Sequence, residues 1–337
     1  MQQHPEAGGP PASVATSSAV QPRTTNVHEL YDVKEAIGVG AFGTVYAAID
    51  RATLAPAALK VQRLSTNPWC LRELEMMKLV TNGASAAAAA PDDEAADTHC
   101  AALLDAFIHD STGSQADDGG GRAGQLQLVI AQPLYDGPDL HDYLTAEGPP
   151  LGERFALTLL RPMLQAIESC HRAGFAHLDA KPENYMFTRA AAGRGPSLVL
   201  VDFGSAEPFT MAPYAETSCA WVEGHDDRLL VTALDRIIGT ARYLSPEVAA
   251  GSFSSRSDVW SVGVCLYMLM TKEAPFELTA RGEAPRFADL DLLAHPTIAA
   301  LSDDTLELLL GMMNKAPALR LSATEALAKT IAIVNRF

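Results

Sequence analysis

The segment FAHLDAKPEN, residues 175–184, is the part of this 337-residue chain that most constrains its fold. It places carboxylates, a lysine and an amide in a short stretch that also contains a rigid proline. Transfer of a phosphoryl group to a hydroxyl needs a carboxylate for the proton, a cation beside the phosphoryl group and an oxygen ligand for Mg²⁺. Asp179, Lys181 and Asn184 supply these three groups, so the segment predicts this chemistry.

A further carboxylate follows a strand-like run. The apolar residues 198–201 are typical of a buried strand, and they lead directly into Asp202-Phe203-Gly204. We therefore predict Asp202 to be a metal ligand.

The front of the chain carries a glycine-rich string over residues 38–45. Glycines let the backbone fold closely over a triphosphate and donate N–H groups to it. Alone the pattern is weak, because it also marks dinucleotide sites and glycine hairpins. A dinucleotide site needs a strand-to-helix turn, whereas residues 44–49 continue as a strand. The members of the predicted phosphate-binding loop are Gly38, Val39, Gly40, Ala41, Phe42, Gly43 and Val45.

Lys60 lies one strand later, at the end of the string Ala58-Leu59-Lys60. Burying a lysine in an apolar strand is expensive unless it has an anionic partner. Phosphates would be one partner, and Glu73 on a predicted helix over residues 71–80 would be another. A lone lysine more often reaches solvent, but the glycine string before it favours a role in phosphate binding.

Strand patterns dominate the front of the chain and helical patterns the back. The predicted strands cover residues 31–37, 43–50 and 57–64, and the predicted helices residues 155–172, 258–271 and 303–314. This division predicts an α+β fold of two lobes with a ligand cleft between them. Pro162 falls inside one helical pattern, where proline costs about 3 kcal/mol unless the helix starts late or kinks.

The composition excludes several classes of protein. The formal net charge is −16, from 25 Lys and Arg against 41 Asp and Glu, and no basic run occurs, so nucleic acid and membrane partners are not expected. Five cysteines without paired or metal-type spacing suit a reducing compartment. The N-terminus lacks the apolar core of a signal peptide, and the apolar run over residues 262–270 is too short to span a bilayer. We expect a soluble protein of the cytoplasm or nucleus.

Polar and small residues mark a tail and several insertions. Residues 1–28 are predicted to be a disordered tail, because they contain few large apolar side chains. Insertions are predicted near residues 81–97, 111–124 and 189–197.

Together, and in this order, the motifs resemble the eukaryotic protein kinase family of the serine/threonine type. The resemblance covers residues 31–330. It implies a two-lobed kinase domain over residues 29–335, with a small strand-rich lobe over 29–133 and a large helical lobe over 134–335. It also implies ATP and Mg²⁺ as cofactors, and serine or threonine hydroxyls of protein substrates as acceptors.

The resemblance assigns roles in nucleotide binding. Lys60 matches the lysine that holds the α- and β-phosphates, with Glu73 as its partner and Glu75 as a less favoured candidate. The glycine loop would cover the phosphates, and Val45 and Ala58 would lie beside the adenine. In the segment between the lobes, Gln132 is the candidate gatekeeper and Leu134 a further nucleotide contact.

The resemblance also assigns roles in the transfer step. Asp179 matches the catalytic base, Lys181 the residue beside the transferred group, and Asn184 and Asp202 the metal ligands. The hydroxyl of Thr240 would bridge Asp179 and Lys181. At the end of the activation segment, the implied ion pair joins Glu247 to Arg320.

Several residues are predicted to be structural. His177, Phe203, Met77 and Asp258 match core side chains that join the lobes. The remaining histidines, His99, His141, His171 and His225 among them, share no metal-type spacing and are expected at the surface or in the core.

The chain departs from the family pattern in two places. Leu178 replaces the arginine that normally binds an activation-loop phosphate, so that phosphorylation switch is in doubt. Some calmodulin-regulated kinases share this leucine, but no basic amphipathic helix follows the domain. The activation segment is also long, with extra length over residues 206–236. This insertion could cover the substrate groove, contact a partner or be disordered, and the last reading is favoured.

These departures leave other functions open. One alternative is a pseudokinase that binds nucleotide and acts as a scaffold, and a kinase for small molecules is a weaker one. For a protein kinase, Glu183 and Asp139 match positions that often receive basic side chains upstream of the target hydroxyl. The strong negative charge also favours substrates with basic residues.

Overall fold

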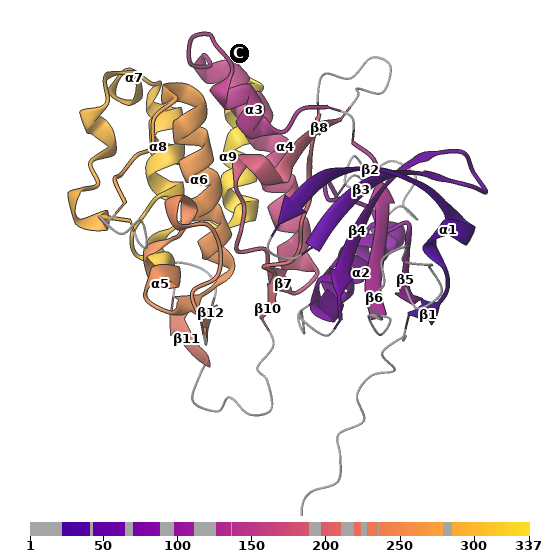
Figure 1. The fold of residues 1–337 in the computed structure, drawn as a ribbon. Coiled ribbons are helices and arrows are strands. Elements are labelled where there is room, and N and C mark those ends of the chain that lie inside the picture. Colours follow the sequence, from indigo (N-terminus) through magenta and orange to yellow (C-terminus); the bar gives the residue numbers. More distant parts are fainter. Residues whose placement is uncertain are drawn as a thin grey trace, which may run out of the picture.

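The computed structural model describes residues 22–40, 43–64, 70–87, 98–110, 126–135, 137–188, 197–209, 219–223, 228–234, 236–278 and 285–337. They form a strand-rich lobe and a helical lobe (Figure 1), which confirms the predicted two-lobed α+β fold. The predicted insertion 111–124, residues 189–196 and the loop residues Ala41 and Phe42 lie outside the described part of the chain.

The small lobe is a six-stranded sheet in the order β1-β5-β6-β4-β3-β2. Its strands are β1 (Arg23–Thr24), β2 (Tyr31–Gly40), β3 (Gly43–Asp50), β4 (Pro56–Arg63), β5 (Asp105–Asp110) and β6 (Leu126–Pro133). Helices α1 (Val27–Leu30) and α2 (Cys70–Ala87) accompany the sheet. Alternate strand residues point to one face, where Tyr31 and Phe107 stack with ring centroids 6.1 Å apart.

Two predicted boundaries in this lobe are wrong. β1 pairs in parallel with β5, and Arg23 forms an ion pair with Asp105, so residues 23–28 are ordered and not part of a tail. Main-chain pairing and a charge pair stabilise this segment where apolar burial is scarce. Residues 81–87 of the predicted insertion 81–97 continue α2, although they include Asn82 and Gly83, which have low helix propensity.

The large lobe is built around α4 (Glu153–Arg172) and α6 (Ser255–Thr271), which pack against each other. The other helices are α3 (Leu140–Thr145), α5 (Pro246–Ala249), α7 (Pro296–Ala299), α8 (Asp303–Met312) and α9 (Ala323–Val334). Short 3₁₀ turns are η3 (Pro182–Asn184), η4 (Ala241–Tyr243), η5 (Phe287–Asp289), η6 (Leu292–Ala294) and η7 (Pro317–Leu319). Pro162 lies inside α4 with its ring in the core, so the helix neither starts late nor ends there.

Helix α6 forms the centre of this lobe, because nearly all of its residues are buried. A capping box starts it: Ser254 Oγ accepts the N–H of Arg256, and Ser257 Oγ accepts the N–H of Ser254. The helix ends at Lys272, whose backbone is left-handed. No helix in the described part of the chain is long and apolar enough to cross a membrane.

Two short ladders hold the segment of residues 177–184 in place. β7 (Phe175–Ala176) pairs with β10 (Glu207–Pro208) before this segment, and β8 (Tyr185–Thr188) pairs with β9 (Ser197–Leu200) after it. Since Asp202 lies between β9 and β10, the two ladders bring it beside that segment.

Part of the predicted insertion 206–236 is folded. Strands β11 (Cys219–Glu223) and β12 (Arg228–Ala233) form a hairpin, and β12 also pairs with β13 (Ser252–Phe253). Reading the whole insertion as disordered is therefore wrong, because its backbone pairs with a strand that follows α5.

Candidate active site

A pocket of about 340 Å³ opens between the two lobes and contains most of the predicted site. Of the predicted residues, it is lined by Gly38, Val45, Ala58, Lys60, Glu73, Gln132, Leu134, Asn184 and Asp202. Val39 is 83% exposed and lies outside the lining, as does Gly40. Gly43 shapes the turn instead, since a Cβ there would approach Val61 O to 2.4 Å.

Sequence reasoning missed part of the apolar wall, formed by Ile37, Ile130, Tyr135, Met186 and Val201. Val201 could have been found because it directly precedes Asp202. A larger open cavity of about 900 Å³ lies in the large lobe beside Tyr267 and His295, but it contains none of the predicted site residues.

Lys60 lies between two carboxylates at the inner end of the pocket. Its Nζ is 2.6 Å from Glu73 Oε1 and 2.6 Å from Asp202 Oδ1. Burial disfavours the charged ammonium, but the two carboxylates outweigh it and raise the pKa of Lys60. The lysine therefore stays cationic, and two acids compete for its charge.

Glu73, rather than the exposed Glu75, is the helical partner of Lys60. Burial raises the pKa of Glu73, against the attraction of Lys60. The second carboxylate oxygen accepts a hydrogen bond from Gln62 Nε2 at 2.5 Å. Gln62 is buried and was not predicted, although it lies two positions after Lys60 and thus on the same face of β4.

Asp179 is held by Thr240 and Lys181. The hydroxyl of Thr240 donates to Asp179 Oδ1 at 2.7 Å and accepts from Lys181 Nζ at 2.9 Å. Lys181 Nζ also lies 2.9 Å from Asp179 Oδ2. The predicted threonine bridge is therefore confirmed, and it fixes the position of the Asp179 carboxylate.

Asn184 and Asp202 present oxygen atoms to the pocket. Asn184 Nδ2 donates to the backbone oxygen of Asp179 at 2.8 Å, an orientation that leaves its amide oxygen as the atom that can bind a cation. Asp202 is 38% exposed, and its Oδ1 also accepts the N–H of Gly204. Burial opposes its ionisation, but Lys60 and Gly204 together lower the pKa of Asp202. Oxygen donors of this kind are those that Mg²⁺ prefers.

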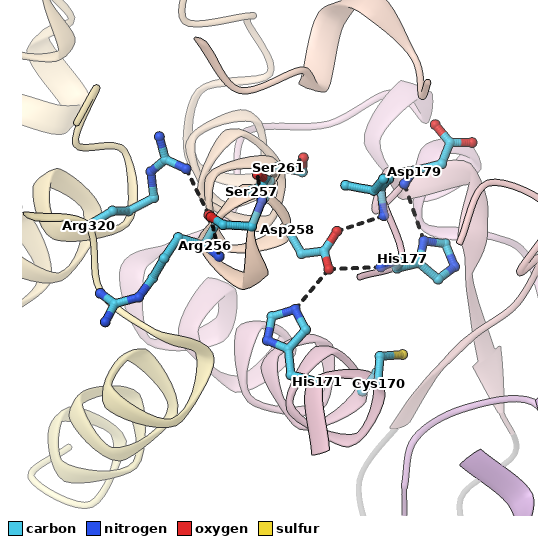
Figure 2. Close-up of polar contacts among 12 residues, drawn as sticks. Cys170, His171, His177, Asp179, Arg256, Ser257, Asp258, Ser261 and Arg320 are labelled. Carbon is cyan, nitrogen blue, oxygen red and sulfur yellow. Dashed lines mark hydrogen bonds and ion pairs between the residues drawn. The ribbon is translucent and has the colours of Figure 1, made fainter. Parts of the chain in front are cut away.

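Asp258 of α6 fixes the backbone at the start of the segment of residues 177–184 (Figure 2). Its carboxylate accepts the N–H groups of His177 at 2.9 Å and Leu178 at 2.7 Å, and it contacts His171 Nε2 at 2.9 Å. Burial would raise the pKa of Asp258, but His171 and the backbone N–H of His177 stabilise the carboxylate, so its pKa lies below the ordinary value. His171 thus contacts a buried residue, and a location in the core was one of the two predicted for it.

His177 is structural. It is fully buried, its ring lies 5.3 Å from that of Phe203, and burial lowers its pKa. The neutral imidazole therefore packs against Phe203, the residue that follows Asp202. Met77 belongs to the same buried cluster as Phe203.

The Glu247–Arg320 pair confirms a second prediction. Arg320 is fully buried, and its Nη1 and Nη2 lie 2.6 and 2.9 Å from the two Glu247 oxygens. Nη1 also donates to the carbonyl of Arg256, as seen in Figure 2. Arg320 attracts Glu247 strongly enough to lower its pKa, although burial opposes this.

Comparison with known proteins identifies a family for this chain. A family model described as protein kinase domain matches residues 121–331. CDPK-related kinase 5 of Arabidopsis thaliana is 32% identical over 206 residues, which are 60% of this chain and 30% of that protein. Calcium-dependent protein kinase 24 of Oryza sativa is 28% identical over 334 residues, or 95% of this chain and 53% of that protein.

A third relative has the same sequence identity as the Arabidopsis protein. Serine/threonine-protein kinase pkn3 of Myxococcus xanthus is 32% identical over 230 residues, which are 66% of this chain and 38% of that protein. The chain thus spans about half or less of the length of these curated relatives.

Proposed function

The chain belongs to the protein kinase family, as its motifs predicted, and on this premise we propose that it transfers the γ-phosphoryl group of ATP to serine or threonine hydroxyls of proteins. One observation supports this activity above the others. Lys60, Glu73 and Asp202 meet at the inner end of the pocket, while Asp179, Lys181 and Thr240 form a second hydrogen-bonded group beside it.

In the proposed mechanism, the protein mainly positions groups and supplies charge. Asp179 accepts or orients the proton of the attacking hydroxyl, and Thr240 and Lys181 keep its carboxylate in place. Lys60 neutralises phosphate charge, and Glu73 prevents Lys60 from collapsing fully onto Asp202. Lys181 lies near enough to Asp179 to serve the transferred group as well.

The donor set at Asp202 and Asn184 fits Mg²⁺, and these two residues would hold it. When bound, the ion neutralises charge on the phosphates of ATP. The apolar wall of the pocket, including Val45 and Ala58, suits the adenine ring. Gln132 and Leu134 also line the pocket and are the further nucleotide contacts we propose.

The proposed substrate class rests on Glu183. Its Oε2 is buried and has no hydrogen-bond partner among the described residues. Glu183 itself lines the pocket, so we propose that its carboxylate pairs with a basic side chain of a protein substrate. Asp139 lines the same pocket and adds to its negative charge.

The test is transfer from γ-labelled ATP with Mg²⁺ to matched peptides that contain serine, threonine or tyrosine with basic or acidic neighbours. We expect label on serine and threonine, most of it on basic peptides, and a reduced basic preference in Glu183→Gln. Label on tyrosine, or a preference for acidic peptides, would refute the proposed specificity. A folded protein that binds ATP without transfer would favour the scaffold alternative.

A further inference from the structure

An ion pair outside the nucleotide pocket joins α2 to the catalytic segment. Arg72 Nη1 pairs with Glu207 Oε2. Arg72 directly precedes Glu73 in the first turn of α2. Glu207 is the first residue of β10 and lies five positions after Asp202 in the sequence. The two side chains thus belong to different lobes, and each is a near neighbour of a residue that contacts Lys60.

The backbone of Glu207 is fixed to the catalytic segment. β10 lies beside β7 (Figure 1). The two strands are antiparallel, with Glu207 opposite Ala176. The N–H of Ala206 donates to the carbonyl of Phe203, and that of Phe209 to the carbonyl of Gly174. Since β7 leads directly into His177, the position of Glu207 is fixed relative to the segment of residues 177–184.

On the other side, Arg72 and Glu73 move together because they lie in the same helical turn. The Lys60–Glu73 pair joins α2 to its own lobe, whereas the Arg72–Glu207 pair joins it to the large lobe. The side chains of Arg72 and Glu207 are 34% and 16% exposed, so the pair is only partly screened by water. A shift of α2 away from the large lobe would break this contact and withdraw Glu73 from Lys60.

We propose that the Arg72–Glu207 ion pair is a positioning clamp that holds α2 where Glu73 keeps Lys60 in the nucleotide pocket. The proposal rests on the proposed kinase function and adds a means of control to the same site. Both charges are encoded in the sequence, so the clamp forms without any covalent modification.

The test is a charge swap in the full chain. The variants are Arg72→Glu, Glu207→Arg and the double variant, and the exposed pair Lys329–Glu307 provides the matched control. We expect each single variant to lower kcat/KM for ATP about tenfold, within the range typical of coupled sites, while the unfolding temperature stays near that of the wild type. The double variant should recover to within about threefold of the wild type, because the attraction is restored.

Hydrogen exchange of the α2 backbone separates failure of the clamp from failure of the proposed function. Each single variant should exchange faster than wild type over residues 70–82, and the double variant should not. Equal exchange in all variants, or a double variant no better than the worse single one, would overturn the clamp. If the wild type transfers no phosphate, the proposed function fails, but the exchange data still decide whether the clamp exists.

Discussion

At the scale of single residues, the site depends on backbone conformations that are costly on their own. Leu178 and Asp202 have φ angles of 62° and 61°, and the left-handed region costs a non-glycine residue about 1–2 kcal/mol. Hydrogen bonds with Asp258 hold Leu178 in this conformation, and the N–H of Gly204 does so for Asp202. The surroundings therefore stabilise a strained backbone where two proposed catalytic segments meet.

Gly239 provides a test of this close packing. Its φ is 99°, and a Cβ at this position would lie 2.3 Å from the carbonyl oxygen of Leu178. We expect Gly239→Ala to displace Thr240 from Asp179, lower the free energy of unfolding by about 3 kcal/mol and reduce kcat. Chemical denaturation and steady-state kinetics measure both effects.

The matched control is Gly251→Ala. Gly251 also has a positive φ of 87°, but a Cβ there meets no atom within 4 Å. This variant should cost only the backbone strain of about 1–2 kcal/mol and leave kcat unchanged. Equal losses in the two variants would show that the contact with Leu178 is unimportant.

The sequence predicts those residues whose chemistry is rare in their setting. Lys60 in an apolar strand, and Asp179 and Asp202 beside short strands, are conspicuous, and the structure brings all three together. Gln62 and Glu207 could not be recognised from the sequence, because a glutamine on a strand and a glutamate near a turn are common. Only the packing of α2 against β4 and β10 gives them partners.

At the scale of elements, α6 and the segments around it form the frame of the large lobe. Asp258 of α6 fixes the segment of residues 177–184, and Arg320, which follows η7, binds Glu247 of α5. The bounds predicted for β2, β3, β4, α4, α6 and α8 agree with the structure to within three residues, because their periodicity is local, whereas α2 extends seven residues beyond its predicted end. β1 and the hairpin β11–β12 were missed, since their pairing depends on segments distant in the sequence.

The Glu247–Arg320 pair predicts a pH dependence of stability. The folded state lowers the pKa of Glu247 below its usual value of 4.5, so the pair stabilises the protein above about pH 4.5 and this contribution is lost as the pH falls through the folded-state pKa. Glu247→Gln leaves the buried Arg320 uncompensated and should cost about 3–5 kcal/mol at pH 7.

Urea denaturation measures this effect between about pH 3 and pH 7, a range that includes the ordinary pKa of glutamate side chains. The difference between wild type and Glu247→Gln should shrink toward the acidic end. Glu307→Gln, which removes the exposed partner of Lys329, serves as control and should follow the wild-type curve. A difference that does not change with pH would contradict the assigned role of Glu247.

At the scale of the whole molecule, two lobes enclose one pocket in a chain with a net charge of −16. Neither lobe contains the complete site, because Lys60 and Glu73 come from one and Asp179 and Asp202 from the other. A chain with this charge attracts cations, and salt screens this attraction with a Debye length of about 8 Å at physiological ionic strength.

The charge predicts how substrate binding responds to salt. Raising NaCl from about 50 to about 300 mM should raise KM for a basic peptide about threefold or more and leave kcat nearly constant. A neutral peptide with the same acceptor serves as control and should change little. The same KM increase for both peptides would rule out electrostatic attraction as the cause.

The most direct measurement is single-turnover transfer from γ-labelled ATP by wild type, Asp179→Asn and Asp304→Asn, the last a control on α8. We predict that Asp179→Asn binds Mg²⁺ and ATP about as well as wild type but transfers at least about a hundredfold more slowly, as expected for loss of a catalytic base. Asp304→Asn should match the wild type. Transfer by Asp179→Asn at the wild-type rate would contradict the proposed mechanism.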